Sequence, residues 1–125
     1  MMKSGIKSIW IVLFGLVSLS VFGQALQNGK YETVTLNVPG VCNMCKARIE
    51  TSSYDVAGVK SVKWDLETEV LTAVIHKQKA SRQKIADALA AVGYRSELAK
   101  ADPEAYAKLP DCCKYDSGIE KHGNN

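Results

Sequence analysis

Four cysteines are the residues of this 125-residue chain whose type and spacing could do chemistry. Cys42 and Cys45 form a C-x-x-C motif, and Cys112 and Cys113 are adjacent. A thiolate is both a nucleophile toward disulfides and a ligand for soft metal ions. Two thiolates in one exposed loop suit a soft, low-coordinate ion such as Cu(I) or Hg(II), whereas Mg(II) and Ca(II) prefer oxygen. On spacing alone, the motif predicts a metal site, a thiol–disulfide redox centre or a structural disulfide.

The adjacent pair leaves further alternatives open. Neighbouring cysteines rarely bridge each other, because the peptide between them must distort to reach disulfide geometry. Cys112 or Cys113 could instead form a disulfide with Cys42 or Cys45, and four cysteines allow three pairings. A flexible tail could also bind metal independently. The sharper hypothesis is that the tail returns to the C-x-x-C loop and adds thiolates. Three thiolates would hold Cu(I) or Hg(II) more tightly, and four could satisfy Zn(II) tetrahedrally.

The N-terminal segment indicates export. Two lysines precede an apolar run over residues 9–21, and the small residues Gly23 and Ala25 follow. This run of about 13 residues is shorter than the roughly 20 that span a bilayer as a helix. We therefore expect residues 1–23 to be a signal peptide, cleaved after Gly23 or alternatively after Ala25. An uncleaved membrane anchor is the alternative. The mature protein is expected in the periplasm or secreted, where thiols tend to oxidise.

Charge and composition exclude several other functions. The chain has 16 Lys and Arg against 13 Asp and Glu. Loss of Lys3 and Lys7 with the signal leaves 14 against 13, a net charge of +1. A chain so close to neutral lacks the basic clusters that bind nucleic acid. It also has no Ser/His/Asp set, no phosphate-binding glycine loop and no carboxylate pair at a predicted pocket, so we predict that it is not an enzyme.

Periodicity predicts the elements that position the cysteines. Alternating apolar residues indicate strands, and apolar residues three and four apart indicate helices. Ser81 is a plausible N-cap, and Gly93 fits the position that ends a helix. In chain order the pattern predicts a strand over 31–38, a helix over 45–54, strands over 59–65 and 70–75, a helix over 82–92 and a strand over 94–98. This β-α-β-β-α-β order describes a ferredoxin-like α+β sandwich, with an antiparallel four-stranded sheet and two helices on one face. A short tail helix is expected over 102–109, begun by Asp102 and Pro103.

The chain resembles the heavy-metal-associated domain family, which includes copper chaperones, modules of metal-transporting ATPases and periplasmic mercury-binding proteins. The matching motifs are V-P-G-V-C-N-M-C at 38–45, Ile49-Glu50, Gly58-Val59, D-L-E-T at 65–68 and Gly93-Tyr94. The resemblance covers residues 31–98 and divides the chain into a lead-in over 24–30, the domain, and a tail over 99–125.

The resemblance implies Cu(I) binding by Cys42 and Cys45. It also implies that the bound ion is transferred by ligand exchange to a metal-transporting membrane protein or another metal-binding domain. Tyr94 would lie beside the loop, as an aromatic does in similar bacterial domains. A thioredoxin-type enzyme would have another strand order and a longer chain, which favours metal binding over redox catalysis. Hg(II) or Zn(II) binding with the tail pair, and thiol–disulfide redox chemistry, stay as alternatives.

The sequence departs from the family in two places. Most members have Met two residues before the first cysteine, packed under the loop, where this chain has Gly40. We expect a more mobile loop, with Met44 partly replacing the lost packing. Ser52 and Ser53 stand at helix positions where similar domains bury Ala and Leu.

Overall fold

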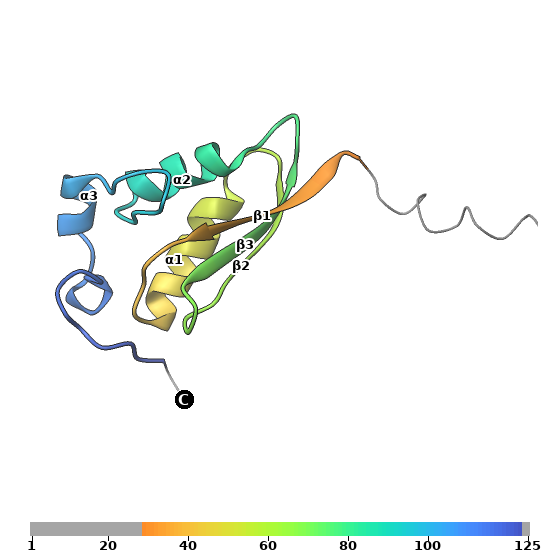
Figure 1. Ribbon diagram of the computed structural model, residues 1–125. Coiled ribbons are helices and arrows are strands. Elements are labelled where there is room, and N and C mark those ends of the chain that lie inside the picture. The colour runs from red at the N-terminus through yellow and green to blue at the C-terminus, as the bar shows by residue number, and fades with distance from the viewer. Residues whose placement is uncertain (1–28, 124–125) are drawn as a thin grey trace, which may run out of the picture.

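The computed structural model describes residues 29–123, so the predicted signal peptide and its cleavage positions lie outside the described residues. Apart from the last predicted strand, the helices and strands follow the predicted order along the chain (Figure 1). They are β1 (Tyr31–Asn37), α1 (Asn43–Tyr54), β2 (Val59–Trp64), β3 (Val70–His76), α2 (Arg82–Ala91), α3 (Pro103–Ala107) and a 3₁₀ turn (Asp111–Cys113). No helix within residues 29–123 is long and apolar enough to cross a membrane.

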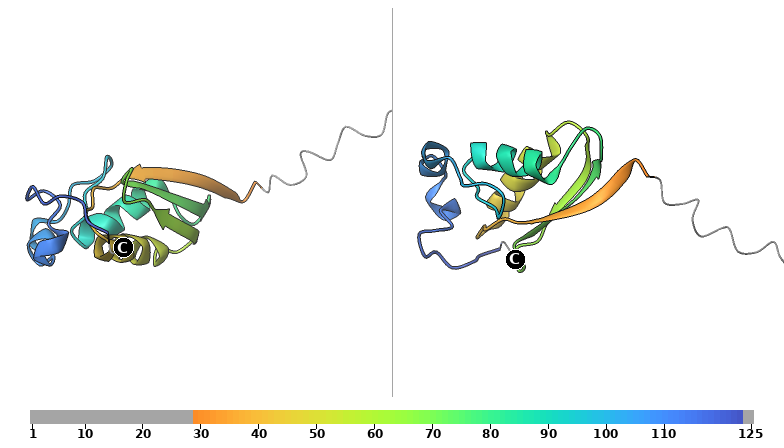
Figure 2. Two further views of the ribbon diagram at one scale, coloured as in Figure 1. Left: turned by 90° about the horizontal axis from the view of Figure 1, so that it is seen from below. Right: turned by 45° about the horizontal axis from the view of Figure 1, so that its top comes forward.

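The strands form one antiparallel sheet of three in the order β1-β3-β2. Leu36 of β1 and Trp64 of β2 both pair with Leu71 of the central strand. All three side chains are buried. They face α1 and α2, which lie together on one side of the sheet (Figure 2). The fold class is therefore α+β, with the two layers of a ferredoxin-like sandwich.

The fourth strand predicted over 94–98 is wrong. Only an isolated bridge between Ser96 and Ala99 forms there. The outer edge of β1, where such a strand would pair, is occupied by side chains. Arg82 donates from Nε to the Thr35 carbonyl at 2.8 Å, and the Glu97 carboxylate accepts from the Asn37 amide at 3.4 Å. Arg82 and Glu97 also form an ion pair at 2.6 Å, so this pair takes the backbone groups that a fourth strand would use.

The buried stripe of α1 consists of Cys45, Ile49 and Ser53, which recur every four residues. Ser53 satisfies its hydroxyl locally by donating to the Ile49 carbonyl at 2.7 Å. Tyr54 falls on the opposite side and is 56% exposed. Because Cys45 belongs to this buried stripe, the first turn of α1 is packed against the core.

The second helix begins and ends as predicted. Ser81 accepts from the Lys84 amide at 3.1 Å as its N-cap. Gly93 ends the segment with φ +98°, and a Cβ there would lie 2.9 Å from the Tyr106 amide. Glycine is needed because both the positive φ and this close approach of the backbone exclude a side chain. Close packing at Gly93 brings α3 against the end of α2.

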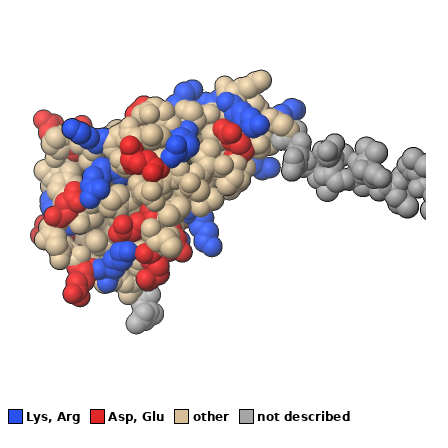
Figure 3. Space-filling model, viewed as in Figure 1, with Lys and Arg blue, Asp and Glu red and all other residues tan. Residues whose placement is uncertain are grey.

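The residues after α2 fold back along the domain. Asp102 caps α3 by accepting from the Glu104 amide at 2.9 Å, and its own amide donates to the Ala90 carbonyl at 3.0 Å. The chain then runs past the 3₁₀ turn to the end of the domain that carries the loop between β1 and α1 (Figures 1 and 2). On the face shown in Figure 3, acidic and basic side chains are interspersed rather than clustered by sign.

Candidate metal centre

The loop between β1 and α1 is packed from below by Trp64. A Cβ on Gly40 would lie 2.8 Å from two carbons of the Trp64 ring. The Trp64 indole also donates to the Val38 carbonyl at 2.9 Å. Met44 does not replace the missing packing, because it points outward from the first turn of α1 and is 48% exposed. That expectation is wrong: the indole fills the space under the loop instead.

Cys42 and Cys45 lie at the N-terminus of α1, which begins at Asn43 rather than at the predicted residue 45. Cys42 is the N-cap, and its sulfur accepts from the Cys45 amide at 3.4 Å. The two Sγ atoms are also 3.4 Å apart. Both residues are buried, so the expectation of an exposed loop is wrong. The reason is that the C-terminal segment covers them.

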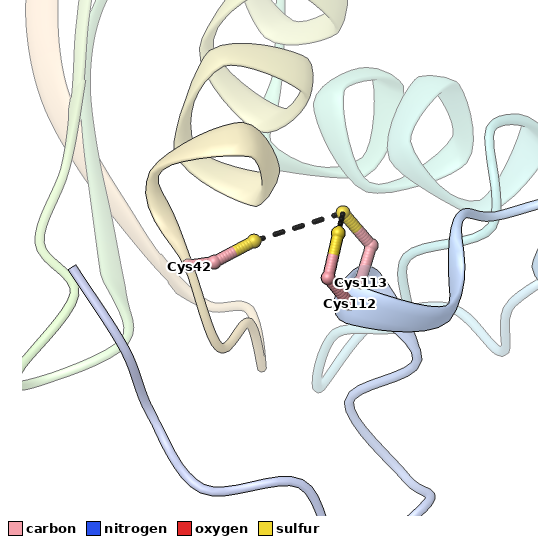
Figure 4. A group of neighbouring side chains, drawn as sticks. All are labelled: Cys42, Cys112 and Cys113. Atoms are coloured by element: carbon pink, nitrogen blue, oxygen red, sulfur yellow. Dashed lines mark hydrogen bonds between the residues drawn. The ribbon is translucent and has the colours of Figure 1, made fainter. Parts of the chain in front are cut away.

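That segment brings the adjacent cysteines to the loop, although they lie 67 or more residues away in sequence. Sγ of Cys113 is 3.7 Å from Sγ of Cys42. Sγ of Cys112 is 4.0 Å from Sγ of Cys113, and the sulfurs of Cys42, Cys112 and Cys113 all lie within 4.8 Å of one another. Figure 4 shows the Cys42 side chain pointing toward the pair. All four cysteines are free thiols.

Tyr94 lies on the inner side of this cluster and is completely buried. Its hydroxyl makes no hydrogen bond of regular geometry. Burial raises the pKa of the Tyr94 hydroxyl, and its interactions with Cys45 and Cys113 raise the pKa further. The hydroxyl therefore stays protonated and is available to donate to a sulfur that carries negative charge.

The three inner thiols differ in acidity. Burial opposes ionisation of Cys45, but the nearby Val41 backbone, Tyr94 hydroxyl and neighbouring thiols, which favour a charged sulfur, outweigh it and lower the Cys45 pKa. Burial raises the pKa of Cys42, and it raises the pKa of Cys113 as well. Cys45 is therefore the first of the three to become a thiolate, with the other two thiols as donors to it.

The C-terminal segment is held by contacts that the sequence did not indicate. The hydroxyl of Tyr115 donates to the Gly93 carbonyl at 2.7 Å and accepts from the Arg95 amide at 3.1 Å. The Tyr115 ring stacks on Tyr94, with centroids 5.6 Å apart. Arg95 pairs with Asp116 at 2.7 Å. The only indication of these contacts in the sequence is that Tyr115 stands two residues after Cys113.

The end of the segment reaches the loop itself. The amide of His122 donates to the Val41 carbonyl at 2.7 Å and forms a bridge with Cys42. The His122 side chain is exposed. Lys121 donates to the Glu67 carbonyl at 2.9 Å and pairs with Glu69 at 3.5 Å. These contacts hold the end of the C-terminal segment against the loop that carries Cys42.

Comparison with solved structures identifies the domain. Oxidized MerP from Ralstonia metallidurans CH34 is 35% identical over 54% of this chain and 94% of its own, with a TM-score of 0.51. The chain belongs to the heavy-metal-associated domain family. The CopZ metallochaperone is 27% identical over 52% of this chain and 98% of its own, with a TM-score of 0.50. A putative copper-ion-binding protein from Bacillus anthracis str. Ames is 27% identical over 56% of this chain and 100% of its own, with a TM-score of 0.52.

No family model matches the chain, and no curated protein does either. The heavy-metal-associated domain thus accounts for little more than half of the sequence. MerP and CopZ are matched over 94% and 98% of their own lengths, but they align with only 54% and 52% of this chain. The cysteine cluster joins the two parts, because it combines the C-x-x-C loop with cysteines of the tail.

Proposed function

We propose that the protein is an exported carrier that captures a soft, thiophilic metal ion through Cys42 and Cys45 and passes it to a partner. Cu(I) is the ion that we propose, and Hg(II) and Zn(II) are alternatives that the same thiols would accept. The observation that carries this proposal is the pair of free thiols 3.4 Å apart at the start of α1. Structural neighbours described as a metallochaperone and a putative copper-ion-binding protein support it.

The loop has the properties that such a site needs. Its donors are sulfur atoms, which select soft ions over Mg(II) and Ca(II). The helix N-terminus favours negative charge through its unsatisfied amides and its dipole. The lowered pKa of Cys45 supplies a first thiolate. An incoming ion would bond to this sulfur and then displace the proton of Cys42.

Transfer would proceed by ligand exchange, with thiols of the partner replacing those of the carrier one at a time. A metal-transporting membrane protein or another metal-binding domain fits this role. The proposed activity is therefore binding and delivery rather than catalysis. The thiol–disulfide alternative also has a specific observation in its favour, since two thiols 3.4 Å apart need little movement to form a disulfide.

The test is competitive native mass spectrometry of the mature chain from Gln24, reduced and anaerobic, with Cu(I), Hg(II) and Zn(II) offered together. We expect one tightly held soft ion. Cys42→Ser and Cys45→Ser should each lower its affinity by orders of magnitude. The fold should survive in Cys42→Ser, because serine is a better N-cap than cysteine. Wild-type affinity in both variants would refute the assignment, and no metal on the unmutated protein would favour redox chemistry.

A further inference from the structure

We propose that Cys113 supplies a third thiolate, so that Cys42, Cys45 and Cys113 bind one metal ion beneath the C-terminal segment. This rests on the proposed function, because it deepens the ligand set of the same site. The ligand chemistry is that of a soft ion in three-coordinate sulfur surroundings. The site would then be a closed compartment built by two separate parts of the chain.

The distances between the sulfurs carry the proposal. A metal–sulfur bond of about 2.3 Å places two ligands in line about 4.6 Å apart, three in a trigonal plane about 4.0 Å apart and four in a tetrahedron about 3.8 Å apart. The observed separations from Cys42 are 3.4 Å to Cys45 and 3.7 Å to Cys113. Both are shorter than the separation that a linear pair requires. Both also lie closer to the trigonal and tetrahedral separations than to the linear one, so Cys42 can share one ion with both neighbours after small movements of the sulfurs.

Burial distinguishes the two tail cysteines. Cys113 is completely buried, and its sulfur lies 3.7 Å from that of Cys42. Cys112 is only partly buried, and its closest sulfur is that of Cys113 at 4.0 Å. Cys113 is thus the buried member of the pair and the one in contact with Cys42, while Cys112 lies within 4.8 Å of Cys42 but is partly exposed. The adjacent residue provides a matched control of identical chemistry.

The segment that carries Cys113 is built into the domain. Tyr115, two residues further on, is held by both its ring and its hydroxyl against Tyr94, Gly93 and Arg95. On the other side of the loop, the His122 amide is bonded to the Val41 carbonyl at 2.7 Å. The position of Cys113 is therefore fixed by the packing around it. It does not depend on the single sulfur contact.

Binding by three thiols has a definite stoichiometry. Each thiol loses its proton as its metal–sulfur bond forms, so one ion displaces up to three protons, without any change of oxidation state. The C-x-x-C pair alone displaces at most two. Affinity that depends on displaced protons rises by about tenfold per pH unit for each proton released. A third thiolate ligand is therefore detectable in the pH dependence of binding as well as in the coordination number.

The experiment is X-ray absorption spectroscopy of the mature protein loaded with Cu(I), and separately with Hg(II), to count the sulfurs around the ion. We expect three sulfurs in the wild type and in Cys112→Ser, and two in Cys113→Ser. Cys113→Ser should also bind at least about tenfold to a hundredfold more weakly, since loss of a supporting partner alone has an effect of that size. Proton release on loading should fall by one in Cys113→Ser only.

Other outcomes separate the two proposals. Two sulfurs in the wild type would overturn the third ligand while leaving the C-x-x-C carrier intact. Loss of a sulfur in Cys112→Ser as well would overturn it in favour of a site that includes Cys112. A wild type that holds no ion would refute the proposed function itself. If Cys113→Ser fails to fold, three sulfurs in both the wild type and Cys112→Ser still assign the third ligand to Cys113, and two sulfurs in the wild type still overturn it.

Discussion

Replacing Tyr94 by Phe should change stability with a sign that depends on pH. The hydroxyl is buried and makes no regular hydrogen bond. Burial of an unpaired hydroxyl costs about 1–3 kcal/mol. Its removal leaves the ring and its stacking on Tyr115 in place. At pH 6, we therefore expect Tyr94→Phe to be more stable than the wild type by about 1 kcal/mol.

At high pH the advantage should reverse. Interaction with the Tyr94 hydroxyl helps to lower the Cys45 pKa below its ordinary value of 9.0. A group with a depressed pKa in the folded state contributes stability above the unfolded pKa and loses it as pH falls through the folded pKa. A hydrogen bond to a charged acceptor contributes about 1.5–3 kcal/mol. This contribution of Tyr94 should therefore grow as the pH rises toward 9.0, and it is missing in Tyr94→Phe.

The assay is urea unfolding of the metal-free, reduced protein at pH 6 and pH 9, with the thiolate absorbance recorded in parallel. Tyr115→Phe is the control, because its hydroxyl is bonded to Gly93 and Arg95 at 2.7 and 3.1 Å. It should lose about 1–3 kcal/mol at both pH values. If Tyr94→Phe loses as much as the control at pH 6, the hydroxyl has a partner there and the reasoning fails.

Two further substitutions test the framework around the site. Gly40→Ala should lose about 1–3 kcal/mol of unfolding free energy by overpacking, since its Cβ would lie 2.8 Å from Trp64. In a Trp64→Leu background most of that loss should disappear, and an equal loss in both backgrounds would contradict the assigned contact. Ser81→Ala should lower thermal stability by about 1 kcal/mol through loss of the cap on the Lys84 amide. An unchanged melting temperature would show that the cap contributes nothing.

The local elements could be predicted from the sequence because their signals are local. The alternation in β1, the cap at Ser81 and the glycine at 93 each depend on residues close in the chain. The missing fourth strand could not be predicted in this way. Whether residues 94–98 pair with β1 is decided by Arg82 and Glu97, whose side chains occupy its edge from outside the strand.

The candidate site shows the same division. Cys42 and Cys45 are recognisable from their spacing, and the hypothesis that the tail returns to them was open from the sequence. The position of Cys113 depends on long-range packing of Tyr115 against Tyr94 and on the backbone bond between His122 and Val41. Neither contact has a periodic signal. Met44 was misplaced for a related reason, because Trp64 fills the space under Gly40 from another strand.

The closure of the C-terminal segment over the loop has a consequence for the timing of delivery. An ion bound there as proposed would reach an acceptor only after the contacts of Tyr115 and His122 open. Release then becomes a first-order event whose rate levels off as the acceptor concentration rises. An uncovered pair of thiolates would instead hand over its ion at a rate proportional to the acceptor. The residence time of the ion would thus be set by aromatic packing several residues away from any sulfur.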